Sequence, residues 1–267
     1  MLLPSRRFER DAGGGMKLAG QVAIVTGAAS GQGRAVSILF AQEGAKVAVA
    51  DINMAGARET VAMIRKNKGK AFAVKCDVTK EPQVKRLVER TVERFGKLTI
   101  LYNNAGTFRQ GADFITNQDL PGWRRVVDVN LTGTFLCCKH GVPEIEKAGG
   151  GVIVNVASSL GLTGTNGLMT YVSSKHGEIG LTKELATELG PKNIRVNAIC
   201  PGPIDTPMLE KSGVVGERRA QMAARLPLRR IGTPEDVAKL ALFLVSNDSS
   251  YVSGAHIVID GGTSARY

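Results

Sequence analysis

Short runs of β-branched and aliphatic residues recur along this 267-residue chain, separated by longer amphipathic stretches, and no other feature limits its fold as strongly. The early runs are almost continuously apolar, which is typical of strands buried on both faces. Such alternation predicts an α/β fold, with helices on both faces of a doubly wound, parallel, seven-stranded sheet. Strands are expected at residues 22–26, 46–51, 71–76, 98–102, 152–156, 195–199 and 256–259, and helices at 33–42, 82–95, 121–146, 171–189 and 234–245.

Two segments stand outside this alternation. Residues 1–15 mix basic and acidic side chains, lack the apolar stretch of a signal peptide and end in three glycines. We therefore expect a disordered leader, followed by one domain over residues 16–267. Residues 207–226 connect two strands, are helix-prone and moderately apolar, and are longer than a minimal connection. We predict that they form a lid over a substrate.

The formal net charge of +11 raises the question of a polyanionic partner. The arginines at 124–125, 218–219 and 229–230 form isolated pairs without interleaved aromatic residues. Scattered charge of this kind favours a solvated surface over a nucleic-acid-binding face. We expect no nucleic-acid partner, with polyanion binding as a weaker alternative.

The four cysteines, Cys76, Cys137, Cys138 and Cys200, form no C-x-x-C pair, and no secretory segment precedes them. This pattern favours reduced thiols and a cytoplasmic location. No run approaches the roughly 20 apolar residues that a membrane-spanning helix needs, so we expect no membrane association. Cys137, Cys138 and His140 lack further ligands at metal spacing, and we expect no metal site.

A glycine-rich turn at residues 26–33, Thr-Gly-Ala-Ala-Ser-Gly-Gln-Gly, joins the first predicted strand to the first predicted helix. Glycines permit a tight turn, and the free N–H groups of a helix start can bind a pyrophosphate. The G-x-x-x-G-x-G spacing is a weak signal by itself. Asp51, however, ends the second strand, where a carboxylate can accept hydrogen bonds from ribose hydroxyls and repel a 2′-phosphate. Together they predict a Rossmann-type dinucleotide site that prefers NAD over NADP. Arg34 is the basic residue that could reverse this preference if its side chain reached a 2′-phosphate.

Further candidates follow the next two strands. Asp77 follows the third and Asn103-Asn104-Ala105-Gly106 follows the fourth, and such sheets bind ligands at the carboxyl ends of their strands. Turn capping is the alternative explanation for these Asp and Asn residues. The cofactor-binding residues predicted from the turn and the strand ends are Gly27, Ser30, Gly31, Gln32, Gly33, Asp51, Ile52, Cys76, Asp77, Val78, Asn104, Ala105 and Gly106.

Tyr171 and Lys175 lie four residues apart near the start of a predicted helix, so they share one helical face. A nearby ammonium favours the ionised form of a phenol, which could then exchange a proton with a carbonyl oxygen. Ser158 lies just after the fifth strand, where its hydroxyl could hydrogen-bond the same oxygen. A surface helix and a turn-forming serine are the alternatives for these two features.

The order of these motifs resembles that of the short-chain dehydrogenase/reductase family. The turn T-G-x-x-x-G-x-G, the loop N-N-A-G, Ser158, Y-x-x-x-K and Pro201-Gly202 follow one another as in that family, over residues 18 to 262. Each motif is weak alone, but their joint occurrence is specific. The resemblance implies an NAD(P)-dependent oxidoreductase of CH–OH groups, with a small alcohol or ketone as substrate and NAD as the expected cofactor.

The resemblance also assigns roles residue by residue. Tyr171 would be the general acid/base, Lys175 would bind the nicotinamide ribose and stabilise the tyrosinate, and Ser158 would orient the substrate oxygen. Asn130 would hold a water in the proton relay, although the pattern alone also fits a helix-bending polar residue. A homotetramer is implied, with two long helices and the last strand at its contacts. Further implied cofactor contacts are Asn104, Tyr171, Lys175, Pro201, Gly202, Ile204 and Thr206.

Two alternatives remain open at this point. Similarity extends to 3-oxoacyl-carrier-protein reductases, which usually take NADPH, but Asp51 weighs against that cofactor. A binding protein that senses dinucleotide without turnover would not need Tyr171, Lys175, Ser158 and Asn130 together.

Overall fold

A computed structural model describes residues 15–111 and 113–266, and it confirms the predicted α/β architecture. Seven parallel strands form one sheet in the order β3-β2-β1-β4-β5-β6-β7. The predicted leader at residues 1–15 lies, except for Gly15, outside the described residues. The strands are β1 (Val22–Thr26), β2 (Lys46–Asp51), β3 (Lys70–Lys75), β4 (Ile100–Asn103), β5 (Gly151–Val156), β6 (Ile194–Pro201) and β7 (His256–Ile259).

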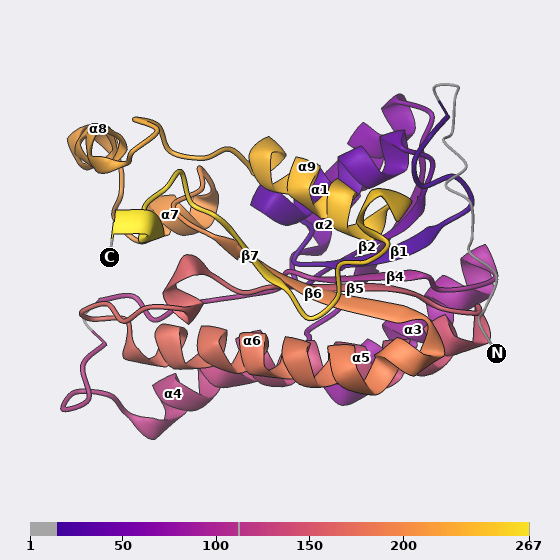
Figure 1. Cartoon of the computed structure of the whole chain (residues 1–267), viewed down its shortest axis with the longest axis horizontal. Helices are drawn as coiled ribbons and strands as arrows, with labels where there is room; N and C mark the ends of the chain where they lie inside the picture. Colours follow the sequence, from indigo (N-terminus) through magenta and orange to yellow (C-terminus); the bar gives the residue numbers. More distant parts are fainter. Residues whose placement is uncertain (1–14, 112, 267) are drawn as a thin grey trace.

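Helices cover both faces of this sheet. In Figure 1, α1, α2 and α9 lie above the sheet and α3 to α6 lie below it. Each layer of helices covers a separate hydrophobic core. Phe40 and Ile64 are buried on the first side of the sheet, and Leu87 and Ile145 on the second. The helices are α1 (Gly31–Gln42), α2 (Met54–Lys66), α3 (Glu81–Phe95), α4 (Leu120–Val127), α5 (Gly133–Lys147), α6 (Met169–Leu189), α7 (Pro207–Lys211), α8 (Gly216–Arg225) and α9 (Pro234–Val245).

The helix predicted at residues 121–146 is present, but it is not α-helical throughout. A single π-helical turn, Asp128–Thr132, lies between α4 and α5, and the helical backbone continues through it. The backbone N–H of Gly133 bonds to the Asp128 carbonyl across this turn. Hydrophobic periodicity does not distinguish such a bulge from a regular α-helical turn, so the sequence predicts one uninterrupted α-helix here.

The segment predicted as a lid, residues 207–226, contains the short helices α7 and α8. No residue of either helix is fully buried, and Figure 1 shows both beyond one end of the sheet. Across the described ranges, no helix has the length and apolar content needed to cross a bilayer.

Candidate active site

The glycine-rich turn and the loop after β4 form one interlocked unit. The Thr26 hydroxyl accepts hydrogen bonds from the backbone N–H groups of Asn104 (3.0 Å) and Ala105 (3.1 Å). The Asn104 side-chain amide donates to the carbonyls of Thr26 and Gly27. A Cβ on Gly33 would lie 2.3 Å from the Gly27 carbonyl oxygen, so only glycine lets α1 begin this close to the turn. Two segments nearly 80 residues apart thus position each other.

The start of α1 leaves donors available to a ligand. Ser30 is the N-cap residue but makes no side-chain capping bond, and the first turn contains no acidic residue. The N–H groups and positive dipole end of this 12-residue helix therefore favour an anion such as a pyrophosphate. In the described structure, the buried Gln32 Oε1 has no hydrogen-bond partner. An acceptor without a partner beside free donors fits a polar dinucleotide.

Asp51 contacts the glycine-rich turn directly. Its Oδ2 accepts from the Ala29 N–H at 2.9 Å, and its Oδ1 accepts from the Asn53 N–H at 2.8 Å. The second bond caps the turn that follows β2. Each carboxylate oxygen retains a further lone pair, and Asp51 lies on the wall of the crevice described next, so capping does not preclude ligand binding.

Arg34 points away from this wall. Its guanidinium donates to the Thr60 hydroxyl, pairs with Glu59 at 3.0 Å and bonds to the carbonyl of Ala29. The side chain is thereby held against α2 and is absent from the crevice lining.

A crevice of about 690 Å³ opens at the carboxyl ends of the strands. It contains most of the cofactor-binding residues predicted from the strand ends, and Thr206 from the loop after β6 closes its other side. Gly33, Tyr171, Lys175, Pro201, Gly202 and Ile204 do not line it. The predicted residues that line it are Gly27, Ser30, Gly31, Gln32, Asp51, Ile52, Cys76, Asp77, Val78, Asn104, Ala105, Gly106 and Thr206.

Gly106 links this crevice to the predicted catalytic residues. A Cβ at this position would lie 3.6 Å from Asn130 Oδ1 and 3.7 Å from Lys175 Nζ. The crevice therefore adjoins α6 and the π-helical turn at Gly106.

Tyr171 and Lys175 share a face of α6, as the spacing predicts. Lys175 Nζ lies 5.6 Å from the centroid of the Tyr171 ring and donates to the Val156 carbonyl of β5 at 2.8 Å. The lysine is 4% exposed, whereas Tyr171 is only partly buried. The ammonium is fixed behind the phenol.

Glu178 is the residue that the sequence analysis missed. Its Oε2 accepts from Lys175 Nζ at 2.6 Å, its Oε1 accepts from the Thr134 hydroxyl at 3.2 Å, and it is 1% exposed. Burial raises the pKa of Glu178 to about 7, against the opposing attraction of Lys175. Burial also opposes the charge on Lys175, but Glu178 and then Tyr171 outweigh it and raise the pKa of Lys175. Its position three residues after Lys175 on one helical face was the available signal.

Asn130 lies in the π-helical turn and is fully buried. Its side chain accepts from the Thr107 N–H at 2.8 Å and donates to the Thr107 carbonyl and to the Ser174 hydroxyl. These bonds join the loop after β4 to α6. The π-helical turn thus places the Asn130 amide between the loop after β4 and α6.

Ser158 lies between β5 and a 3₁₀ turn at Ser159–Gly161. Its hydroxyl accepts from the Leu160 N–H at 3.1 Å and contacts the Pro201 carbonyl at 3.5 Å. The structure thus brings the end of β6 beside Ser158.

The cysteines offer little chemistry at this site. All four are buried, and burial raises the pKa of the Cys76 and Cys138 thiols to about 12. His140 contacts Glu81 at 2.9 Å. Within the ranges that the structure describes, no three His, Cys, Asp or Glu side chains form a cluster able to hold a metal.

A model of the family described as enoyl-(acyl carrier protein) reductase matches residues 27–264. The 3-oxoacyl-(acyl-carrier-protein) reductase FabG of Thermotoga maritima is 43% identical over 92% of this chain and 99% of its own length. Cyclohexanol dehydrogenase of an Acinetobacter species is 40% identical, over 94% of this chain and 97% of its own.

Solved structures of similar proteins share this fold. Levodione reductase superposes with a TM-score of 0.90 at 34% identity, covering 94% of this chain and all of that one. A 7α-hydroxysteroid dehydrogenase in complex with NADH and 7-oxo-glycochenodeoxycholic acid gives a TM-score of 0.87 at 38% identity, covering 92% of this chain and 95% of that one.

Proposed function

The chain belongs to the short-chain dehydrogenase/reductase family of nicotinamide-dinucleotide-binding oxidoreductases, and we propose that it transfers a hydride between NAD(H) and an alcohol/carbonyl substrate. The observation that carries the proposal is the position of Lys175. It is buried behind the Tyr171 ring, and its ammonium lies beside Gly106 of the crevice. The proposed proton donor and the proposed dinucleotide site therefore adjoin each other.

The chain's own residues handle the proton. A bound nicotinamide dinucleotide supplies or accepts the hydride. Tyr171 gives a proton to the carbonyl oxygen during reduction and takes it back during oxidation. Lys175 stabilises the phenolate of Tyr171 by its charge, and the Ser158 hydroxyl orients the substrate oxygen. Asn130 supports the relay by tying Thr107 to Ser174.

Asp51 supports NAD as the cofactor. Two ribose hydroxyls would donate to its carboxylate, whereas a 2′-phosphate would meet like charge at a partly buried group. Arg34 is the sequence neighbour best able to offset that repulsion, and its contacts with Glu59 and Thr60 hold it elsewhere. We expect NAD to be preferred at least about tenfold in kcat/KM, and Asp51→Ala to lower the ratio. Preference for NADP, or a ratio unchanged in Asp51→Ala, would contradict this role.

An apolar, cyclic secondary alcohol or ketone is the substrate class that we propose. Met208 lines the crevice, and Leu160, Leu162 and Met169 are close in the chain to Ser158 or Tyr171; Leu162 and Met208 are exposed. Similar proteins are named for cyclohexanol and 7α-hydroxysteroid. A panel of cyclic alcohols, linear secondary alcohols and sugars assayed with NAD tests this proposal. A sugar turned over faster than every cyclic alcohol would overturn it.

The 43% identity to FabG favours a second candidate, an NADPH-dependent 3-oxoacyl reductase. Asp51 argues against it. Reduction of a 3-oxoacyl thioester with NADPH, measured beside cyclohexanone with NADH, separates the two functions. A non-catalytic dinucleotide sensor would instead bind NADH and turn over neither substrate.

We propose that α7 and α8 close over substrate, since Thr206, Pro207, Met208 and Lys211 line the crevice. Closure should slow protease cleavage within 207–226 when NAD and substrate are present, and equal cleavage would refute it.

We also propose a cytoplasmic homotetramer that uses the long helices and β7, whose Val258 is 37% exposed. Its mass in solution by light scattering is the test.

A further inference from the structure

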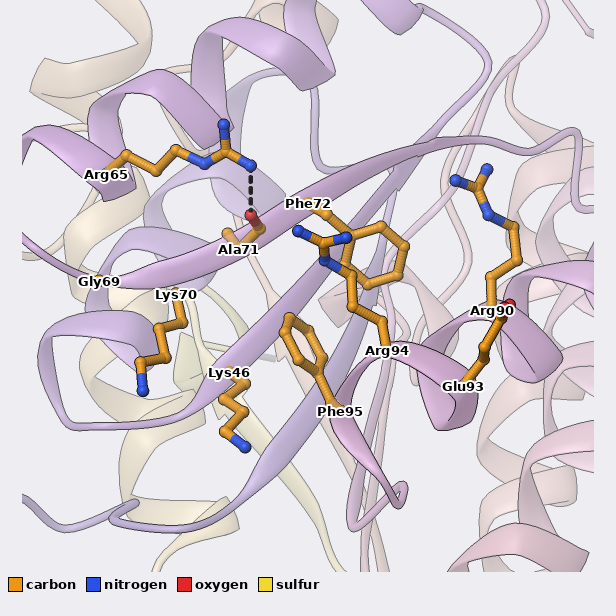
Figure 2. Close-up of a pocket in the computed structure, with 10 residues that line it drawn as sticks. All are labelled: Lys46, Arg65, Gly69, Lys70, Ala71, Phe72, Arg90, Glu93, Arg94 and Phe95. Carbon is orange, nitrogen blue, oxygen red and sulfur yellow. Dashed lines mark hydrogen bonds between the residues drawn. The ribbon is translucent and has the colours of Figure 1, made fainter.

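A second cavity lies at the opposite end of the sheet from the crevice. It has a volume of about 770 Å³ and is formed where β2 and β3 begin and where α2 and α3 end. We call it the basic pocket. Figure 2 shows its lining, which consists of Lys46, Arg65, Gly69, Lys70, Ala71, Phe72, Arg90, Glu93, Arg94 and Phe95.

The charge of the basic pocket is unbalanced. Five cationic side chains and one carboxylate, Glu93, line it, and no ion pair involving any of these six is found in the described ranges. Elsewhere on the surface, cations such as Lys192 and Arg230 have carboxylate partners within 2.7 Å. The pocket thus concentrates uncompensated positive charge in a concave site.

The fold brings like charges together here. Lys46 and Lys70 are register partners on the neighbouring strands β2 and β3. Arg90 and Arg94 are four residues apart on α3, a spacing at which like charges destabilise a helix. An anion bound between these groups would remove the repulsion.

An aromatic floor holds the arginines in place. The Arg94 and Arg90 guanidinium carbons lie 5.4 and 5.9 Å from the centroid of the Phe72 ring, and Phe95 packs edge-on against that ring at 5.3 Å. Phe72 is 6% exposed, so the floor is part of the core. Arg65 is fixed separately by a 3.2 Å hydrogen bond to the Ala71 carbonyl, drawn in Figure 2. Guanidinium groups restrained in this way lose little entropy when they bind an oxyanion.

We propose that the basic pocket is a binding site for a small polyanion that carries a chain of phosphate groups. Three guanidinium groups offer the forked donors that match phosphate oxygens, and two lysines add charge. The volume falls in the range of small-molecule sites, about 300–1,000 Å³. This site is separate from the dinucleotide crevice and does not depend on the proposed reaction.

Calorimetric titration of the full chain, saturated with NADH to fill the crevice, tests the site with inorganic tripolyphosphate. The pocket variant is Arg65→Gln, Arg90→Gln and Arg94→Gln combined. We expect one site per chain in the wild type and at least about tenfold weaker binding in this variant, since several charge-assisted hydrogen bonds are lost. No binding by the wild type would overturn the proposal.

A control variant with the same change in net charge carries Arg58→Gln, Lys66→Gln and Arg86→Gln, which lie on the same two helices outside the pocket. It should bind tripolyphosphate as the wild type does. Equal weakening in both variants would show a general charge effect and refute the site. If the pocket variant does not fold, Lys46→Gln with Lys70→Gln replaces it, with the same expectation.

Two further ligands identify the source of the phosphate chain. ATP that binds no more tightly than tripolyphosphate would assign the site to the phosphate chain alone, and tighter binding would assign it to a nucleotide. Either result supports the proposal. A short DNA duplex that binds while tripolyphosphate does not would replace it with a nucleic-acid surface, and the slope of affinity against salt would then count the phosphates contacted.

Discussion

Lys175 and the cations of the basic pocket differ in their burial and in their ion pairing. Lys175 is buried, held by Val156 and Glu178, and aimed at one neighbouring side chain. The pocket cations are mostly exposed and have no carboxylate partner among the described residues. A charge that acts on its own chain needs a fixed position and a nearby counter-charge, because an unpaired buried ion costs several kcal/mol. A charge that awaits a ligand can remain unpaired because water solvates it meanwhile.

The largest effect is expected when the Tyr171 hydroxyl, the group on which Lys175 acts, is removed. Tyr171→Phe retains the ring but lacks the proton, so kcat should fall at least about 100-fold, as for loss of a general acid. NADH affinity, measured by fluorescence titration, should change less than about threefold, within the usual range for a lost peripheral contact. Full activity in Tyr171→Phe would show that Lys175 serves another group.

The next effect concerns stability. Lys175→Met leaves the Glu178 carboxyl buried without its cation, which should destabilise the protein by about 3 kcal/mol. Lys175→Met combined with Glu178→Leu removes both charges and should recover most of this loss. Urea denaturation of the two single variants and the double variant measures the coupling. Additive losses would mean that the buried pair does not act as a unit.

A smaller effect is expected in the pH dependence. The Glu178 carboxylate offsets the field of Lys175 at Tyr171, and this offset grows as pH rises through the Glu178 pKa of about 7. Glu178→Gln removes the negative charge, so the phenolate is favoured and alcohol oxidation should appear at lower pH, by about one unit.

The kcat/KM profile against pH measures this shift, which a purely structural role would not produce. Glu178→Asp should restore the wild-type profile in part, and Glu184→Gln, an exposed change on the same helix, should leave it in place. A shift to higher pH in Glu178→Gln would reverse the assigned sign.

The smallest effect is expected in the basic pocket. Arg94→Gln loses a cation–π contact with Phe72 worth ~0.5–1 kcal/mol but relieves repulsion from Arg90 of ~0.2–0.5 kcal/mol. The free energy of unfolding should therefore stay within about 0.5 kcal/mol of the wild type. A loss above 2 kcal/mol, far beyond a surface contact, would make Arg94 structural and weaken the contrast with Lys175.

The fold was largely predictable from the chain. Short runs rich in β-branched and aliphatic residues marked all seven strands, and β1, β2 and β7 have the predicted bounds. The long helix at 121–146 was not predictable in detail, because the π-helical turn around Asn130 is stabilised by bonds to Thr107 and Ser174, which are distant in sequence.

Local sequence determined the pairs that depend on helical or strand period. Tyr171 and Lys175 share a face because 3.6 residues make one turn, and Asp51 ends β2 because the apolar run of that strand stops there. These relations span few residues and survive any packing that preserves the element.

Tertiary structure decided which partner each side chain found. Arg34 turned toward Glu59 and away from the crevice, and Glu178 became the buried partner of Lys175. Lysines and arginines that appear scattered at positions 46, 65, 70, 90 and 94 met in one pocket, because parallel register and helix packing set their distances. Local periodicity carries no information about such tertiary contacts, which form only when distant segments pack together.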